Sequence, residues 1–549
     1  MANFVSKYTG AQHDEAVRLT GELNGKVATL SEEIAFKPEA YGLPILHLTG
    51  DTTGMTKDNA VVLTYTYGER NGTCEVKWQG SSSLQWPKKN YTIKFDNGFE
   101  AVAGWGAQKK YCFKANFIDH SHARNVGSCK LWGQMVKSRS MPTTCIPHAT
   151  NGWVYKEYYT YEDGAYNAPY SVAVSGKGRY CINGFSVPAG IYDVATDVFM
   201  PSGGSGKNAM ATLYTENAKE AYGLTEVPVT DAWTRVVISG VDASSFSAPC
   251  RLSIQGRETE NVKFKNIVLT NTVTGESIPV HPPAWQMKGL PNGGAIDGFP
   301  CVILLNGAFH GLYTWNIPKD GWMLGMPKAI VSADQHCDAT KFKALATMNG
   351  DFKLEYVEDE NNTEWVLPSL NRAIQSVIDG SVDVVGQYID LPSAIDYYIH
   401  TVDENAADGT SHNYLLVTYD GVKWYFVAYD RDTTYGLHWD GKDIYSPAFA
   451  NVTYSGYASD NTLMWLIYTY KKADLKARAI EMRDGIKSAA NVATVFSNFI
   501  GGIPSQVLDA DAKSWPTIPS TSASNLAQIV SWYMMRRQII DKEIDGWTV

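Results

Sequence analysis

The sequence predicts a mixed α+β protein in which an all-β sandwich interrupts a larger α+β domain, preceded by a short helical segment. The chain has 549 residues, several times the size of one ordinary core. It is 44% hydrophobic and 19% charged, which suits folded domains and excludes extensive disorder. The pattern of residues changes near residue 148 and again near 283. It predicts mixed strands and helices before 148, strands with frequent turns between these positions, and mixed strands and helices after 283.

Four segments follow from these changes. Residues 1–40 are expected to form an N-terminal anchor or oligomerisation segment. The larger domain then occupies 41–147 and 284–549, and a jelly-roll-like sandwich occupies 148–283.

Residues 10–35 carry apolar pairs at a seven-residue step, such as Leu23 with Val27 and Leu30 with Ile34. This spacing predicts a short amphipathic helix. The helix would either pack on its own domain or anchor the chain to another protein.

Strands and one helix are predicted for the first part of the larger domain. Asn71-Gly72 indicates a hairpin turn. The predicted elements are strands at 61–67, 74–78, 91–95 and 110–117 and a helix at 126–136.

The insertion and the second part differ in pattern. Short strands separated by frequent turns predict the sandwich, with strands at 170–174, 190–195, 234–238, 250–254 and 262–269. The second part is expected to have strands at 301–305 and 311–315, helices at 363–380, 391–403, 460–488 and 523–545, and a hairpin at 413–429.

Charge and cysteine usage exclude several function classes. The formal net charge is -10, which argues against a broad surface for nucleic acid. The eight cysteines form no CxxC pair, so neither a zinc site nor a disulfide framework is expected. No apolar run reaches the length of a membrane helix, and the N-terminus lacks the pattern of a signal peptide. A soluble protein made in the cytoplasm is therefore expected.

The densest group of polar residues lies around the predicted hairpin at 413–429. Asp408 precedes it, Asn413 is its first residue, and Asp430 and Asp432 follow its second strand. Mg²⁺ prefers hard oxygen ligands, and kinase-like phosphoryl transfer uses a base Asp, a metal-binding Asn and a metal-binding Asp in this order. The alternative is that these residues only form turns.

Four runs of residues resemble the ordered motifs of the CotH kinase-like family, over about 60–147 and 284–540. The runs are 78–95, 114–125, 306–313 and 408–436. The resemblance implies an atypical protein-kinase-like fold and, from the characterised members, phosphorylation of spore-coat or surface proteins. It implies Mg²⁺ and ATP as cofactor and substrate.

The resemblance also implies roles for individual residues. Gly80 and Ser82 belong to a loop that approaches phosphates, and either Lys94 or Lys114 neutralises them. Asp408 is the expected base, Asn413 and Asp430 are metal ligands, and Asp432 either reaches the metal or orients Arg124. Arg124 and Asn125 are expected to fix the fold.

Aromatic residues in the insertion suggest sugar binding. The insertion is similar in style to carbohydrate-binding sandwiches, and Trp153, Tyr159 and Trp233 are the residues expected to stack on sugar rings. The alternative is that these side chains belong to the core of the sandwich.

A short N-terminal run, residues 7–17, resembles the opening of bacteriophage virion appendage proteins. We therefore expect a virion structural protein of the fibre, spike or decoration type, with the kinase-like body as scaffold and the sandwich as a glycan-binding module for host attachment. Its expected partners are other virion proteins, surface glycans and further copies of itself, with no nucleic acid and no membrane insertion. The alternatives are an active Mg-ATP-dependent protein kinase and a purely carbohydrate-binding adhesin.

Overall fold

The computed structural model describes residues 36–139, 187–280 and 290–548, apart from 216–218, 247–249, 260–261, 276, 420, 443 and 517–524. Elsewhere it describes residues 15, 18–20, 22, 159–161, 172–174, 180–181 and 287. Residues 15, 18–20 and 22 are helical, and the rest of the run at 7–17 lies outside the described residues.

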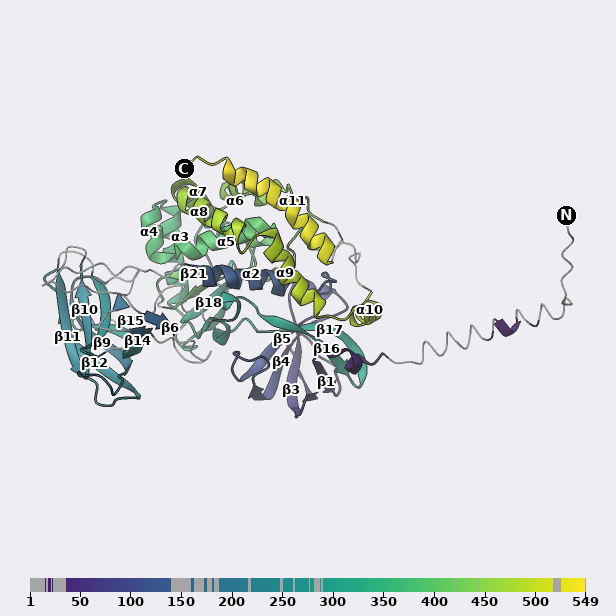
Figure 1. Cartoon of the computed structure of the whole chain (residues 1–549), viewed down its shortest axis with the longest axis horizontal. Helices are drawn as coiled ribbons and strands as arrows, with labels where there is room; N and C mark the ends of the chain where they lie inside the picture. The colour runs from purple at the N-terminus through teal and green to yellow at the C-terminus, as the bar shows by residue number, and fades with distance from the viewer. Residues whose placement is uncertain are drawn as a thin grey trace.

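A closed seven-stranded barrel forms the N-terminal part of the body, below α9 and α10 in Figure 1. Its order is β1-β16-β17-β5-β4-β3-β2, and only β1 and β16 pair in parallel. Alternating side chains fill the interior, so that Tyr91, Ile93 and Phe95 of β4 are buried. The strands are β1 (Ile45–Thr49), β2 (Val61–Tyr67), β3 (Arg70–Gln79), β4 (Asn90–Phe99), β5 (Gln108–Lys114), β16 (Gly298–Leu305) and β17 (Ala308–Asn316).

The first hairpin of the barrel turns earlier than the sequence indicates. β2 ends at Tyr67 and β3 begins at Arg70, so the turn is at Gly68 and Glu69, where Gly68 has φ +57°. Gly72 lies inside β3 against the carboxylate of Asp96. A Cβ on Gly72 would stand only 2.5 Å from Asp96 Oδ2. That glycine allows a close approach and does not form the turn.

The sandwich strands pair only with one another among the described strands. One sheet has the order β11-β10-β13-β8, and the other has β12-β9-β14-β7-β6 with β15 beside β14. Among the residues whose side chains are described, the core between them consists of residues from 187 to 269. The strands are β6 (Tyr159–Tyr161), β7 (Val172–Val174), β8 (Tyr180–Cys181), β9 (Ile191–Phe199), β10 (Asn208–Tyr214), β11 (Glu220–Glu226), β12 (Trp233–Asp242), β13 (Arg251–Arg257), β14 (Val262–Asn271) and β15 (Ser277–Val280).

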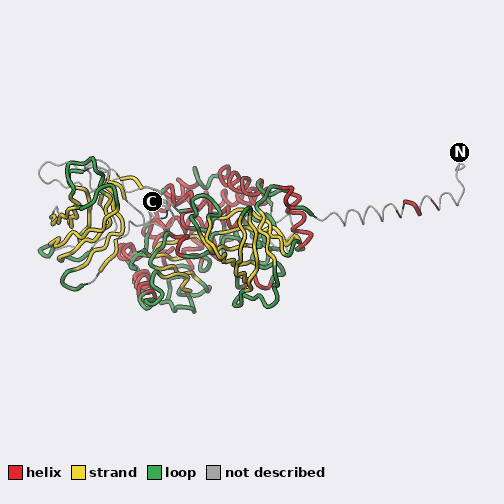
Figure 2. Tube along the Cα trace, turned by 90° about the horizontal axis from the view of Figure 1, so that it is seen from below, coloured by secondary structure: helices red, strands yellow, loops and turns green. Residues whose placement is uncertain are grey.

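A four-stranded sheet of order β19-β18-β20-β21 and a group of helices form the C-terminal part. Figure 2 shows helices gathered beside the strands of the body. The strands are β18 (Ala329–Ala333), β19 (Phe352–Val357), β20 (Tyr414–Thr418) and β21 (Trp424–Ala428). The helices of this part are α3 (Val366–Ile378), α4 (Val382–Tyr388), α5 (Leu391–Glu404), α6 (Tyr454–Asp460), α7 (Thr462–Tyr470), α8 (Lys472–Asp484), α9 (Ala489–Gly501), α10 (Ser505–Ser514) and α11 (Leu526–Asp545), and α2 (Arg124–Ser138), which follows β5 in the chain, packs with them.

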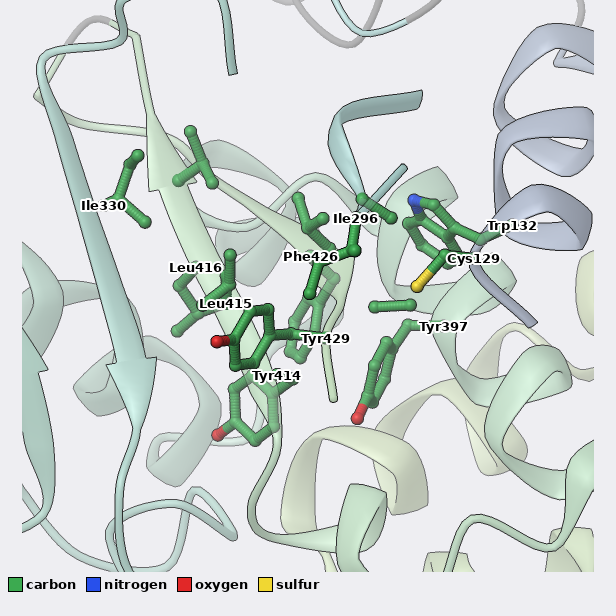
Figure 3. Packing of buried hydrophobic residues seen from close by; sticks show 14 of the residues in the cluster. Cys129, Trp132, Ile296, Ile330, Tyr397, Tyr414, Leu415, Leu416, Phe426 and Tyr429 are labelled. Atoms are coloured by element: carbon green, nitrogen blue, oxygen red, sulfur yellow. The ribbon is translucent and has the colours of Figure 1, made fainter. Parts of the chain in front are cut away.

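The hairpin and the helices α3, α5 and α11 are close to the prediction, but the helix expected at 460–488 is divided into α7 and α8. The sequence did not predict α4, α6, α9 and α10, nor the strands β18 and β19. One apolar cluster runs from the barrel into the C-terminal sheet. Within it, Tyr397 of α5 packs against Phe426 of β21 and Trp132 of α2, with ring centroids 5.2 and 6.3 Å away (Figure 3). The body is therefore mixed α+β with a continuous core.

No described helix combines the length and the apolar character that crossing a bilayer requires. The six cysteines whose state the structure describes are free.

Candidate functional site

A cavity of about 470 Å³ lies where loops of the barrel meet loops of the C-terminal sheet. It is lined by every residue expected from the sequence to contact nucleotide or metal, except Lys94. The lining residues are Gly80, Ser81, Ser82, Ser83, Gln85, Trp86, Lys88, Asn90, Lys114, Asn116, Phe117, Ile118, His336, Asp408, His412, Asn413, Asp430, Asp432, Thr433 and Trp439.

The loop between β3 and β4 forms one wall. Gly80 has φ +123°, and a Cβ there would stand 2.0 Å from Ser83 Oγ, so only glycine fits. Ser83 Oγ accepts a hydrogen bond from Asn90 Nδ2 at 3.2 Å, and Asn90 Oδ1 accepts one from the backbone N–H of Ala115 at 2.7 Å. The loop is thus tied to the strand that carries Lys114.

Two consecutive lysines hold the far end of this loop. Lys89 Nζ donates to the backbone oxygens of Leu84 and Trp86, at 2.6 and 2.5 Å. Lys88 is buried and donates to Asp511 Oδ1 on α10 at 2.7 Å. Both side chains fix the wall of the cavity.

The structure distinguishes the two lysines between which the sequence does not choose. Lys114 ends β5 inside the cavity, with Nζ 3.5 Å from Asp430 Oδ1 and a side chain 12% exposed. Burial lowers the pKa of Lys114, but Asp430 and Asp432 outweigh this effect and raise it overall. Lys94 lies on the outer face of the barrel, where its side chain is 61% exposed and its Nζ lies 4.0 Å from Glu75.

The two aspartates after β21 form the acidic side of the cavity. Asp430 adopts a left-handed backbone with φ +51°, which is strained for a residue with a side chain. Its buried Oδ1 accepts no hydrogen bond from a described residue. Burial, and next to it the charge of Asp430, raise the pKa of Asp432 to about 8. Such crowded carboxylates favour a bound cation.

Helix α5 positions the loop that carries Asp408. The helix is capped at its start by Asp390 and ends at Asn405, which has φ +52°. Tyr397 Oη, from within α5, donates to Gly409 O at 2.6 Å. A Cβ on Gly409 would stand 2.5 Å from the NH1 of buried Arg431, so glycine is needed directly after Asp408.

Asp408 itself is half-exposed and has two polar neighbours. Its Oδ1 lies 3.7 Å from His336 Nε2, and its Oδ2 accepts a 3.4 Å hydrogen bond from Thr433 Oγ1. Asn413 lines the cavity just before β20 and has φ +53°, so it is strained like Asp430.

Sequence reasoning missed His336 and His412, whose rings lie 4.9 Å apart at the cavity. Burial, followed by the charge of His336, lowers the pKa of His412. His336 follows the buried strand β18, and His412 adjoins Asn413. A polar residue shortly after an apolar strand was the available signal for His336.

The residues present fit Mg²⁺. Asp430 and Asp432 offer carboxylate oxygens and Asn413 offers an amide oxygen, which are the hard ligands that this ion prefers. The described residues contain no group of three or more His, Cys, Asp or Glu side chains that could hold a metal ion by themselves. Mg²⁺ shared with phosphate needs only one or two carboxylates.

Arg124 and Asn125 have structural contacts at the start of α2. Arg124 is fully buried and pairs with Asp119 at 2.6 Å, so Asp119 orients it. Asn125 Oδ1 accepts a hydrogen bond from the backbone N–H of Arg431 at 3.1 Å. These contacts join the helix to the loop that follows Asp430.

Of the residues expected to bind sugar, the structure describes the side chain of Trp233 alone. Trp153 lies outside the described residues, and Tyr159 belongs to β6 but its side chain is outside them. Trp233 begins β12, is 39% exposed and contacts the Phe199 ring edge-to-face at 5.8 Å.

The family model described as CotH kinase protein matches residues 300–540. No curated protein matches the chain. Four solved chains match, among them the carbohydrate-binding module TmCBM61 in complex with β-1,4-galactotriose, at 14% identity and a TM-score of 0.12 over 23% of this chain and 74% of that one. Residues 300–540 are therefore similar to the CotH kinase family, and they include Asp408, Asn413, Asp430 and Asp432, whereas Gly80, Ser82 and Lys114 precede the match.

Proposed function

We propose that the cavity binds a magnesium nucleoside triphosphate and transfers its terminal phosphoryl group to a hydroxyl acceptor. The observation that carries the proposal is the convergence of three distant segments in one cavity. The β3–β4 loop with Gly80, the end of β5 with Lys114, and the loops around the β20–β21 hairpin all meet there.

The order of elements supports a kinase-like arrangement. A glycine-containing loop between two strands is followed by a strand with a lysine and then by helix α2. Protein kinases place their phosphate loop, lysine, base Asp, metal-binding Asn and metal-binding Asp in this order. The sandwich is inserted between α2 and β16.

Each residue has a role in this proposal. Lys114 pairs with phosphate oxygens, and the backbone around Gly80 and Ser82 covers them. Asn413, Asp430 and Asp432 hold Mg²⁺, which supplies positive charge against the phosphate oxygens. Asp408 accepts the proton of the attacking hydroxyl.

Calorimetric titration of the full chain with ATP and Mg²⁺ tests the proposal. Saturable binding is expected and is lost in Asp430→Ala, whereas Asp545→Ala keeps it. Asp545 is an exposed aspartate that pairs with Arg483 at the end of α11 and does not line the cavity. Absence of binding by the folded wild-type chain would overturn the proposal and leave the body as a scaffold.

We propose glycan binding as a second function, located in the sandwich. The exposed Trp233 ring on β12 supports it, because a flat aromatic surface can stack on the apolar face of a sugar. Electrophoresis of the full chain through gels containing xylan, β-glucan or galactan tests it. Retardation by one of them should be lost in Trp233→Ala and retained in Trp465→Ala, an exposed tryptophan of α7.

The virion location is a separate hypothesis that rests on residues 7–17. Immunogold labelling of purified phage particles with an antibody against the chain tests it. Labelled particles are expected, and label found only in soluble lysate would exclude a virion protein.

A further inference from the structure

Part of the cavity lining is apolar and mostly aromatic, in contrast to the acidic residues around Asp430. Trp86, Phe117, Ile118 and Trp439 line it. The Trp86 ring stacks on Phe117 with centroids 5.4 Å apart and planes 26° apart. Trp439 is 56% exposed, although it is a large aromatic side chain beside a cavity.

The loop that carries Trp439 is braced from both sides. Gly441 approaches Ile118 so closely that a Cβ would stand 3.0 Å from Ile118 Cβ. On the other side, Trp532 Nε1 of α11 donates to Tyr445 O at 2.7 Å. Trp439 is therefore an exposed ring close to two residues of its loop, Gly441 and Tyr445, that contact the body. Such contacts reduce the backbone entropy lost when a ligand stacks on the ring.

Polar side chains lie near the expected base. His336 and Thr433 both contact Asp408, and His412 lies beside His336. These side chains can accept from and donate to hydroxyl groups.

Cationic partners for an anionic acceptor are scarce at the cavity. The lysines among its described lining residues are Lys88 and Lys114, and they already pair with Asp511 and Asp430, respectively. The lining thus favours a neutral acceptor over a phosphorylated or acidic one.

We propose that the phosphoryl acceptor is a hydroxyl group of a neutral saccharide whose apolar face lies on Trp439. This inference rests on the proposed phosphotransferase function and names its acceptor. Aromatic platforms beside a few convergent polar groups are suited to sugars, which have apolar C–H faces and hydroxyl rims.

The reaction balances with the nucleoside triphosphate as the only co-reactant. The saccharide oxygen forms a new bond to the terminal phosphorus as the bond from that phosphorus to the bridging oxygen breaks. The nucleoside diphosphate leaves, and the hydroxyl proton passes to Asp408.

The test uses the full chain with Mg²⁺ and ATP labelled in its terminal phosphate. The acceptor probes are cellobiose, lactose and diacetylchitobiose, and casein serves as the protein acceptor. Label is expected on at least one saccharide. Trp439→Ala should raise the KM for that saccharide about tenfold, as loss of one stacked ring would.

Two further variants separate stacking from a general structural effect. Trp439→Phe keeps an aromatic ring and should recover most of the lost affinity. Trp465→Ala removes an exposed tryptophan of α7 that does not line the cavity, and the KM should be unchanged.

Label on casein or on the chain itself, with none on any saccharide, would overturn the inference while leaving the phosphotransferase proposal in place. An unchanged KM in Trp439→Ala would also overturn it. If calorimetry on the same wild-type preparation detects no ATP binding, the phosphotransferase proposal fails and this inference fails with it.

Discussion

Lys88 and Lys114 both line the cavity and both pair with an aspartate, but the surroundings of the two pairs differ. Lys88 Nζ lies 2.7 Å from Asp511 Oδ1, and the two side chains are 1% and 3% exposed. Asp511 also accepts a hydrogen bond from the backbone N–H of Leu312 at 2.8 Å. Lys114 Nζ lies 3.5 Å from Asp430 Oδ1, which accepts no hydrogen bond from a described residue.

The carboxyl groups respond accordingly. Desolvation opposes ionisation of Asp511, but Lys88 and His122 outweigh it and hold the pKa well below its usual value. At the other pair, the pKa of Asp432 is raised to about 8 by burial and by Asp430. The same residue types thus form a fully paired structural contact at Asp511 and a group of closely spaced carboxylates at Asp430.

Removing the aspartate should change stability much more at the Lys88 pair than at the Lys114 pair, and this is the largest effect we expect. Asp511→Ala leaves the buried Lys88 ammonium without its counter-charge, so unfolding free energy should fall by about 3–5 kcal/mol. Asp430→Ala relieves repulsion with Asp432, so stability should change by less than about 1 kcal/mol. Denaturant unfolding of both variants measures the difference.

A matched variant sharpens this result. Asp545→Ala removes an exposed aspartate from a surface ion pair with Arg483 and should leave stability nearly unchanged. If Asp430→Ala destabilises the chain as much as Asp511→Ala does, the two pairs are both structural and the comparison is wrong.

The pH dependence of stability should have opposite signs for Asp511 and for Asp432, the neighbour of Asp430. The pKa of Asp511 is lower in the folded chain than in the unfolded chain, where it is about 4. Asp511 therefore stabilises the fold above about pH 4, and this stabilisation is lost as pH falls below that value. The pKa of Asp432 is raised in the folded chain, so its protonated form stabilises the fold fully below about pH 4. This stabilisation is lost as pH rises to about 8.

The unfolding free energy of the metal-free chain, measured between pH 4 and 9, tests the effect predicted for Asp432. Asp432→Asn should remove most of the decline in the unfolding free energy over that range. Asp545→Asn should leave the decline in place. A profile for Asp432→Asn that parallels the wild type would show that Asp432 is ionised throughout.

A smaller effect is expected from the loop that covers the crowded pair. Gly80→Ala places a Cβ 2.0 Å from Ser83 Oγ and should shift the loop, lowering nucleotide affinity about tenfold by calorimetry. Gly68→Ala is the control, because Gly68 also has positive φ but no atom lies within 4 Å of its Cβ position. It should cost about 1–2 kcal/mol of stability and leave affinity unchanged. Equal losses of affinity would contradict the role of the loop.

Local patterns were sufficient to predict much of the fold and of the candidate site. The alternation in β4 and the apolar strands on both sides of a turn at 419–423 are short-range signals. Asp408, Asn413 and Asp430 lie within one such hairpin unit, so the sequence could group them. Alternation could also have separated the two lysines, because Lys94 lies between the inward-facing Ile93 and Phe95.

Long-range pairing could not be predicted in this way. Asp511 is 423 residues from Lys88 in sequence, and only closure of the whole body brings α10 to the barrel. His336 likewise reaches Asp408 from a different strand of the C-terminal sheet. Nothing in the local sequence around these residues specifies the partner, so their contacts depend on tertiary packing.

The smallest expected effect concerns Lys94, and it sharpens the distinction between a lysine of the motif and a lysine of the site. Lys94 lies on β4, and its ammonium group faces solvent near Glu75. An exposed pair at 4.0 Å contributes little, so Lys94→Met should change stability by less than about 0.5 kcal/mol and leave Mg-ATP affinity unchanged. Lys114→Met removes the cation that faces Asp430 and should weaken binding strongly. Calorimetry on the two variants compares equal chemical changes at neighbouring strands. A loss of affinity in Lys94→Met that matches the loss in Lys114→Met would place phosphate on the outer face of the barrel and contradict the assignment of the cavity.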